Sequence, residues 1–215
     1  MALLYSGTTD GYVYKYTTDT WTNNRDAATG SQASSTTHFY GRCIRTFHTS
    51  GRGGDTYFVG RAFFAFNTSG ITSVPSIARL KIHGYSYTSA DVIAVKATKP
   101  DGATGIAVAD FDAITGFTAG ASMSGNVTDY SAEISSWTTS TYNNLELNED
   151  ARSDMASLDV FAVCLVEYDH DYLNIAPSEA DIVSGVWFAD EEGTSKDPYL
   201  FYKLTDNATF FGANF

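Results

Sequence analysis

The sequence predicts an all-β protein, an antiparallel β-sandwich of jelly-roll type with about nine or ten strands and one short helix. Three observations predict this class: apolar residues alternate with polar ones along many short stretches, turn-forming residues separate those stretches, and no internal repeat or linker is visible. The chain has 215 residues, of which 43% are hydrophobic and 14% aromatic, which suffices for a packed core. We expect one domain over residues 10–204, an N-terminal arm over 1–9 and a C-terminal tail over 205–215.

Alternation with a period of two predicts the strands of the first half. They cover residues 12–16, 42–47, 57–66, 77–85 and 91–97. Residues 80 and 82 are apolar between polar neighbours, which is typical of a strand buried on one face. The long polar connection over residues 17–37 predicts a loop, and such loops are often functional or mobile.

The second half begins with a weaker pattern. Residues 110–137 carry only spaced apolar residues and are expected to be rich in loops. Asn148 is a good N-cap and two acids follow it, which predicts a short helix over residues 148–155. Residues 158–168 are apolar on both faces through 160–166, so they predict a central strand. The last strands are expected at residues 185–189 and 198–204.

Composition and charge narrow the possible partners. Lys and Arg number 13 against 25 Asp and Glu, so the net charge is −12. Such a chain does not attract phosphate backbones, and we expect no nucleic-acid partner. No stretch approaches the roughly 18 consecutive apolar residues of a membrane span, and no signal-peptide pattern opens the sequence. We therefore expect no membrane partner and folding in a cytoplasm.

No catalytic pattern stands out, so we expect the protein not to be an enzyme. The four histidines occur singly, without a metal-binding spacing, and the sequence has no GxSxG motif. A glycosidase would need two carboxylates across a cleft, and the surroundings single out no pair. The two cysteines, Cys43 and Cys164, are expected to be buried free thiols, with a structural disulfide as the alternative.

Several stretches resemble, in order, a DNRLRE-type domain, a jelly-roll domain related to disaggregatase repeats and to a family of carbohydrate-binding modules. The matching stretches are residues 10–14, 61–71, 77–82, 186–191 and 197–200. The resemblance spans roughly residues 10–204, and most matched positions are structural. Where this family usually has an acid after its Phe-x-Phe strand, the chain has Asn67, which weakens the transfer of an ion or sugar site. Similar domains occur in uncharacterised virion proteins of tailed phages.

The densest cluster of acids lies at the end of the predicted central strand. If the strand continues, the carboxylates of Glu167, Asp169 and Asp171 share one face. Such a face could hold Ca²⁺, which prefers about six to eight oxygen ligands. Ca²⁺ is the one cofactor that the sequence suggests. The alternative, which we favour, is a solvated strand end leading into a loop.

Exposed aromatic rings could form a platform that binds the apolar faces of sugars. The candidates for such a glycan-binding surface are Trp21, Tyr85, Tyr87, Trp137 and Tyr142. The alternative, which we favour, is that each ring fills an end of the sandwich.

Apolar residues at both ends of the chain predict contacts with neighbouring subunits. They are Leu3, Leu4 and Tyr5 in the N-terminal arm and Phe210, Phe211 and Phe215 in the tail. Together with the family resemblance, they favour a non-enzymatic structural protein of a phage virion: a capsid-decorating (cement) protein, head fibre or tail component. It is expected to form a homo-oligomer and to contact other virion subunits. The alternative function is a carbohydrate-binding module, possibly assisted by Ca²⁺.

Overall fold

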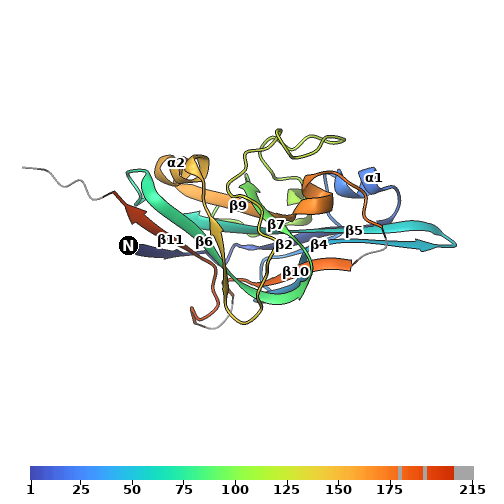
Figure 1. Cartoon of the computed structure of the whole chain (residues 1–215), viewed down its shortest axis with the longest axis horizontal. Coiled ribbons are helices and arrows are strands. Elements are labelled where there is room, and N and C mark those ends of the chain that lie inside the picture. The colour runs from blue at the N-terminus through green and yellow to red at the C-terminus, as the bar shows by residue number, and fades with distance from the viewer. Residues whose placement is uncertain (179–180, 191–192, 206–215) are drawn as a thin grey trace, which may run out of the picture.

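The computed structural model describes residues 1–178, 181–190 and 193–205, and it confirms the all-β class. The described residues form eleven strands, slightly more than expected, in an antiparallel sandwich of jelly-roll type (Figure 1). The strands are β1 (Ala2–Tyr5), β2 (Gly11–Thr18), β3 (Gln32–Ser34), β4 (Phe39–Gly51), β5 (Gly54–Asn67), β6 (Pro75–Thr88), β7 (Val92–Lys96), β8 (Tyr142–Glu146), β9 (Val160–Glu167), β10 (Asp181–Trp187) and β11 (Tyr199–Leu204).

The strands form two layers. One layer has the order β3-β2-β5-β9-β7, and the other contains β1, β11, β6 and β8. Strands β4 and β10 connect the layers, because β4 pairs with β5, β10 pairs with β4, and β10 also pairs with the end of β6. The main core fills the space between the layers, with Phe64, Leu80 and Phe161 among its fully buried side chains.

Strand β4 changes its partner along its length. Its second half pairs with β5 from Arg45, opposite Gly60, to the hairpin turn at Gly51 and Gly54. Beyond Gly60 the strand β9 takes over this edge of β5, while β4 continues along β10. Gly60 is required here, since a Cβ on it would lie 2.8 Å from the carbonyl oxygens of both Arg42 and Cys43.

A second core lies on the opposite face of the β2-β5-β9-β7 layer. Its buried side chains include Val59 and Phe63 from β5 and Phe111 and Ile114 from the long connection after β7. That connection and the short helix α1 (Trp21–Arg25) cover this face. Odd-numbered residues of β5 therefore face the second core, and the even-numbered residues from Ala62 to Phe66 face the main core.

The helices differ in part from the expectation. The predicted helix is present as α2 (Glu149–Ser157), with the Asn148 side chain accepting a hydrogen bond from the backbone N–H of Ala151. The expected loop over 17–37 contains α1, capped by Thr20, and the short strand β3. Neither α1 nor α2 has the length and apolar character that crossing a bilayer requires, and the described residues contain no such helix.

The expected N-terminal arm is wrong for residues 2–5. These residues form β1, which pairs with β11 as an edge strand of the second layer. Leu4 packs against the main core, and this contact together with the backbone pairing holds the segment on the domain. The predicted tail residues Phe210, Phe211 and Phe215 lie outside the described residues. Cys43 and Cys164 are both buried and free, as expected.

Candidate functional site

The most suggestive surface feature is a groove at the point where β4 leaves β5. Its volume is about 350 Å³. Strand β2 contributes Tyr14 and Tyr16, β4 contributes Tyr40, Arg42, Arg45 and Phe47, and β5 contributes Phe58. We call it the aromatic groove.

The rings of the aromatic groove are arranged by the register of the sheet. Tyr12, Tyr14 and Tyr16 alternate along β2, so they point to the same face. Tyr14 lies opposite Gly60, which has no side chain, and its ring stacks on Phe58 with 4.7 Å between centroids. The Tyr40 ring lies nearly parallel to that of Tyr12, 3.7 Å away. The result is a series of nearly parallel rings beside an open groove, with Tyr16 half exposed.

Two arginines lie at the aromatic groove. Arg45 makes a bidentate ion pair with Asp181, with its Nε 2.6 Å from Oδ1 and its Nη2 3.0 Å from Oδ2. Its guanidinium also lies over the ring of Phe58, 4.5 Å from the centroid. Arg42 is exposed, and no carboxylate of the described residues forms an ion pair with it. Burial, and then the neighbouring tyrosines, raise the pKa of the Tyr40 hydroxyl, so it remains a neutral donor.

This arrangement provides flat apolar surfaces next to hydrogen-bonding groups. Ligand sites are typically concave and apolar with a few polar groups that fix the orientation of the ligand. Tyrosine supplies both parts, since its ring is apolar and its hydroxyl is polar. The guanidinium of arginine adds donors in a planar fork that match paired oxygens. The chemistry fits a molecule with one apolar face and several hydroxyl or acidic groups.

The predicted sugar platform does not assemble as expected. Trp21 and Trp137 are each only 7% exposed, and their indole N–H groups donate to Asn174 Oδ1 and to the carbonyl oxygen of Gly185. Both rings are buried, so neither belongs to an exposed platform. Tyr142 is half buried and donates to the carbonyl oxygen of Asp197.

Tyr85 and Tyr87 are the two exposed members of the predicted platform, at 40% and 42%. Tyr85 stacks on Phe39 and meets the edge of Trp187. Both ring partners of Tyr85 thus lie outside the predicted set, and the two tryptophans of that set are buried. The platform as the sequence predicted it is therefore wrong.

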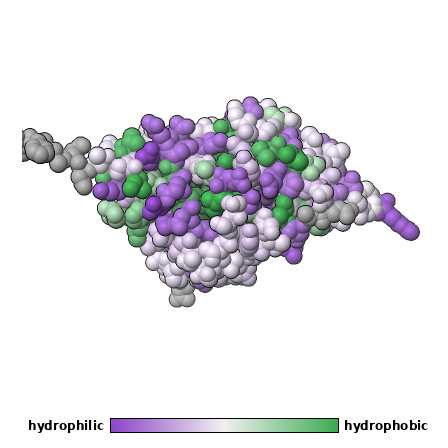
Figure 2. Space-filling view, in the orientation of Figure 1, coloured by the Kyte–Doolittle hydropathy of each residue, from purple (hydrophilic) through white to green (hydrophobic). Residues whose placement is uncertain are grey.

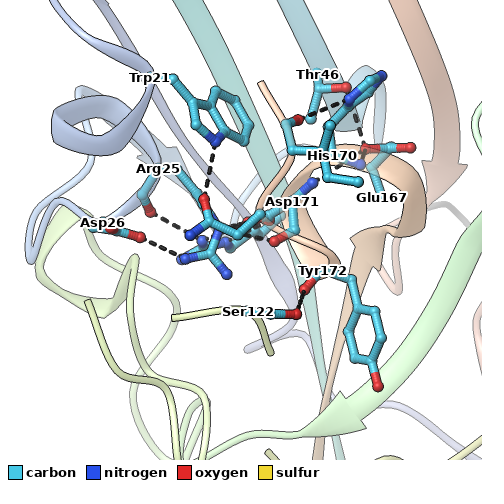
Figure 3. Close-up of polar contacts among 12 residues, drawn as sticks. Trp21, Arg25, Asp26, Thr46, Ser122, Glu167, His170, Asp171 and Tyr172 are labelled. Carbon is cyan, nitrogen blue, oxygen red and sulfur yellow. Dashed lines mark hydrogen bonds and ion pairs between the residues drawn. The ribbon is translucent and has the colours of Figure 1, made fainter. Parts of the chain in front are cut away.

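The expected row of three carboxylates is also wrong, because β9 ends at Glu167. Residues Tyr168–Tyr172 form a π-helical turn instead of a continuing strand (Figure 3). The Glu167 carboxylate accepts hydrogen bonds from the backbone N–H groups of Asp169 and His170, at 2.9 and 2.8 Å, and from the Thr46 hydroxyl. Asp169 is exposed, whereas Asp171 points into the second core. The described residues contain no group of three His, Cys, Asp or Glu side chains that could hold a metal ion.

Asp171 belongs to a buried ion cluster that organises the second core. Both of its carboxylate oxygens accept from Arg61, each at 2.8 Å, and its backbone oxygen accepts from Arg25. Arg61 also donates to the backbone oxygens of Phe111 and Arg25. Arg25 pairs with Asp26 at 2.5 Å (Figure 3). Neither arginine side chain is exposed. The cluster therefore ties α1, the long connection and the π-helical turn to β5.

A second surface feature is the outer side of the layer formed by β1, β11, β6 and β8. Leu3 and Tyr5 are 53% and 38% exposed there, beside the half-buried rings of Phe201 and Tyr199. Ile77, 41% exposed, lies on the same face of β6 opposite Lys203, and Arg79 and Lys81 separate it from the end of the strand, so the face carries charges between its apolar side chains. Figure 2 shows hydrophobic side chains at the end of the molecule where β1 and β11 lie. We call it the outer face.

One signal for the aromatic groove is present in the sequence, namely the alternation of tyrosines at positions 12, 14 and 16. It predicts a strand, but nothing in it predicts that Tyr40 stacks on the first of these rings. Comparison with known proteins adds no further assignment: no protein-family model matches the chain, and no curated protein matches it either.

Proposed function

We propose that the protein is a non-catalytic carbohydrate-binding module and that the aromatic groove is its binding site. The observation that carries this proposal is the combination of parallel tyrosine rings and two arginines around one open groove. A sugar ring has an apolar face that packs on an aromatic ring. The hydroxyls at the edge of the sugar accept and donate hydrogen bonds. The resemblance to carbohydrate-binding relatives supports the same assignment.

The Arg45–Asp181 pair supports the proposal in a second way. The bidentate geometry fixes the orientation of the Arg45 guanidinium at the aromatic groove, and a fixed side chain lowers the entropic cost of binding. Phe47 and Phe58 lie under the guanidinium and hold it in place. The aromatic groove is therefore largely preformed, as most small-ligand sites are.

Replacing Tyr16 with alanine is expected to weaken glycan binding about tenfold while leaving the fold intact. The ring is half exposed and contributes one wall of the aromatic groove, so its loss removes stacking area and little core packing. The measurement is a glycan array followed by titration calorimetry on the glycans that bind.

Tyr85→Ala is the matched control, because Tyr85 is similarly exposed but lies with Phe39 and Trp187. Binding that survives Tyr16→Ala and disappears with Tyr85→Ala would place the site elsewhere. Wild-type protein that binds no glycan on the array would count against carbohydrate binding as a whole.

A second candidate function is a structural role in a phage virion, as a capsid-decorating, fibre or tail component. The outer face favours it, because the edge strand β1 presents the exposed side chains of Leu3 and Tyr5 beside the rings of Phe201 and Tyr199. The proposed partners are other virion subunits and further copies of the chain. Such a protein could also present the aromatic groove to a host glycan.

Leu3→Lys is expected to abolish self-association and incorporation into particles without a change in stability beyond about 0.5 kcal/mol. Because the Leu3 side chain is exposed, the added positive charge should disrupt a contact made by the outer face but not the packing of the core. Light scattering and co-sedimentation with assembled particles measure the effect. Leu158→Lys, at an exposed leucine next to α2, serves as the control, and equal behaviour of the two variants would reject the outer face as the contact.

A further inference from the structure

We infer that the aromatic groove selects glycans that carry a negative charge, a carboxylate or a sulfate, and that Arg42 binds that charge. This inference rests on the proposed carbohydrate function and narrows it to one chemical class of ligand. It follows from the charges around the aromatic groove.

The two arginines of the aromatic groove differ in their partners. Arg45 is neutralised by Asp181, and its guanidinium is held against Phe47 and Phe58. Arg42 has an exposed side chain and no ion pair with a carboxylate of the described residues. Its charge nevertheless acts on the neighbouring Tyr40 hydroxyl, where it opposes the burial that raises the pKa of that group. The charges of Arg42, Arg45 and Asp181 thus leave one positive charge in excess beside the stacked rings.

The position of Arg42 follows from the path of β4. In chain order, Arg45 is the first residue of β4 that pairs with β5. The residues before it, back to Phe39, lie beyond this pairing and run along β10. This departure brings Arg42 and Tyr40 to one side of the aromatic groove, facing the rings that β2 contributes. A sugar stacked on those rings would therefore carry an acidic substituent toward Arg42.

The net negative charge of the chain makes the excess positive charge at the aromatic groove selective for anionic glycans. The net charge is −12, so most of the surface repels an anionic polymer. Only 13 residues are Lys or Arg, and two of them line this one groove. Arg79, Lys81 and Lys203 form another cationic region on β6 and β11, but the aromatic groove combines its arginines with stacked rings, which favours it as the position for an anionic sugar.

The test is affinity electrophoresis in gels that contain either acidic or neutral polysaccharides. The acidic probes are polygalacturonate, hyaluronan and chondroitin sulfate, and the neutral probes are galactan, dextran and mannan. The wild-type protein is expected to be retarded by at least one acidic polysaccharide and more weakly by the neutral ones. Arg42→Gln should lower the affinity for the acidic polysaccharide about fivefold.

Arg52→Gln is the matched control, because Arg52 is exposed at the β4–β5 turn and its replacement changes the net charge equally. It should behave like the wild type. The difference between wild type and Arg42→Gln should also shrink as salt rises from low to about 0.5 M.

The failures of the two proposals are distinguishable. Retardation by neutral polysaccharides that is lost in Tyr16→Ala but unchanged in Arg42→Gln would overturn the selection for charge and leave carbohydrate binding in place. No retardation by any of the six polysaccharides would count against carbohydrate binding itself. Equal losses in Arg42→Gln and Arg52→Gln would show a general effect of charge and overturn the role of Arg42.

Discussion

Replacing Asp171 with alanine is expected to lower the free energy of unfolding by about 3–5 kcal/mol. The carboxylate accepts two hydrogen bonds from Arg61, and both side chains are completely buried. Without it, the guanidinium of Arg61 keeps its charge in a low-dielectric core, with backbone oxygens and the rings of Phe111 and Phe117 as its remaining contacts. Urea denaturation measures the loss directly.

Two variants make this expectation specific. Asp169→Ala removes an exposed carboxylate two residues earlier in the same turn, and it should change the stability by no more than about 0.5 kcal/mol. The double variant Arg61→Met with Asp171→Leu should be more stable than Asp171→Ala alone, since it removes both charges together. Equal stabilities of Asp171→Ala and Asp169→Ala would contradict the structural role given to the buried ion cluster.

The stability of the protein is expected to fall by several kcal/mol between about pH 4 and pH 8 because of Asp10. Burial raises the pKa of this carboxyl from its usual 3.8 to about 8, against the hydrogen bonds from Ser6 and the backbone of Ala189. A folded-state pKa above the unfolded value means that this contribution is fully present below about pH 4 and is lost as the pH rises through 8. Each pKa unit corresponds to roughly 1.4 kcal/mol.

Asp10→Asn isolates this contribution from those of the other carboxylates. The amide oxygen can still accept from the backbone N–H of Ala189 but carries no charge. The variant should therefore be more stable than the wild type at pH 8, and the advantage should vanish near pH 4. Urea midpoints at pH 4, 6 and 8 test this. Glu167, whose pKa burial raises to about 7, retains a smaller dependence of the same sign in both proteins. Parallel pH profiles of the two proteins would refute the assignment to Asp10.

The strands of the core were predictable because burial on alternate residues leaves a periodic pattern in the sequence. Residues 77–85 show it and lie within β6, whereas residues 57–66 lie within β5, which is buried on both faces and reads as a nearly continuous apolar run. β1 and β3 have only four and three residues, too few for a period to be visible. The π-helical turn after Glu167 was not predictable either, because its stability comes from hydrogen bonds to the Glu167 carboxylate and from Arg61, far away in the sequence.

The candidate site was less predictable than the fold because it depends on contacts between distant segments. The tyrosines of β2 are visible in the sequence, but Tyr40 joins them only because β4 leaves β5 at Gly60. In contrast, Trp21 and Trp137 suggest a sugar platform by residue type alone, and their burial removes them from the surface. The residue types therefore indicated that aromatic rings could bind a ligand, while the path of β4 decided which of these rings lie at the surface.

The most direct test of carbohydrate binding at the aromatic groove is to locate a bound saccharide on the protein. The measurement is a titration of isotope-labelled protein with an oligosaccharide of the best-bound polysaccharide, followed by NMR chemical shifts. Our account predicts that the largest shifts occur at Tyr14, Tyr16, Tyr40 and Arg42. Shifts centred on Tyr85 and Trp187, or on the outer face around Leu3, would contradict it.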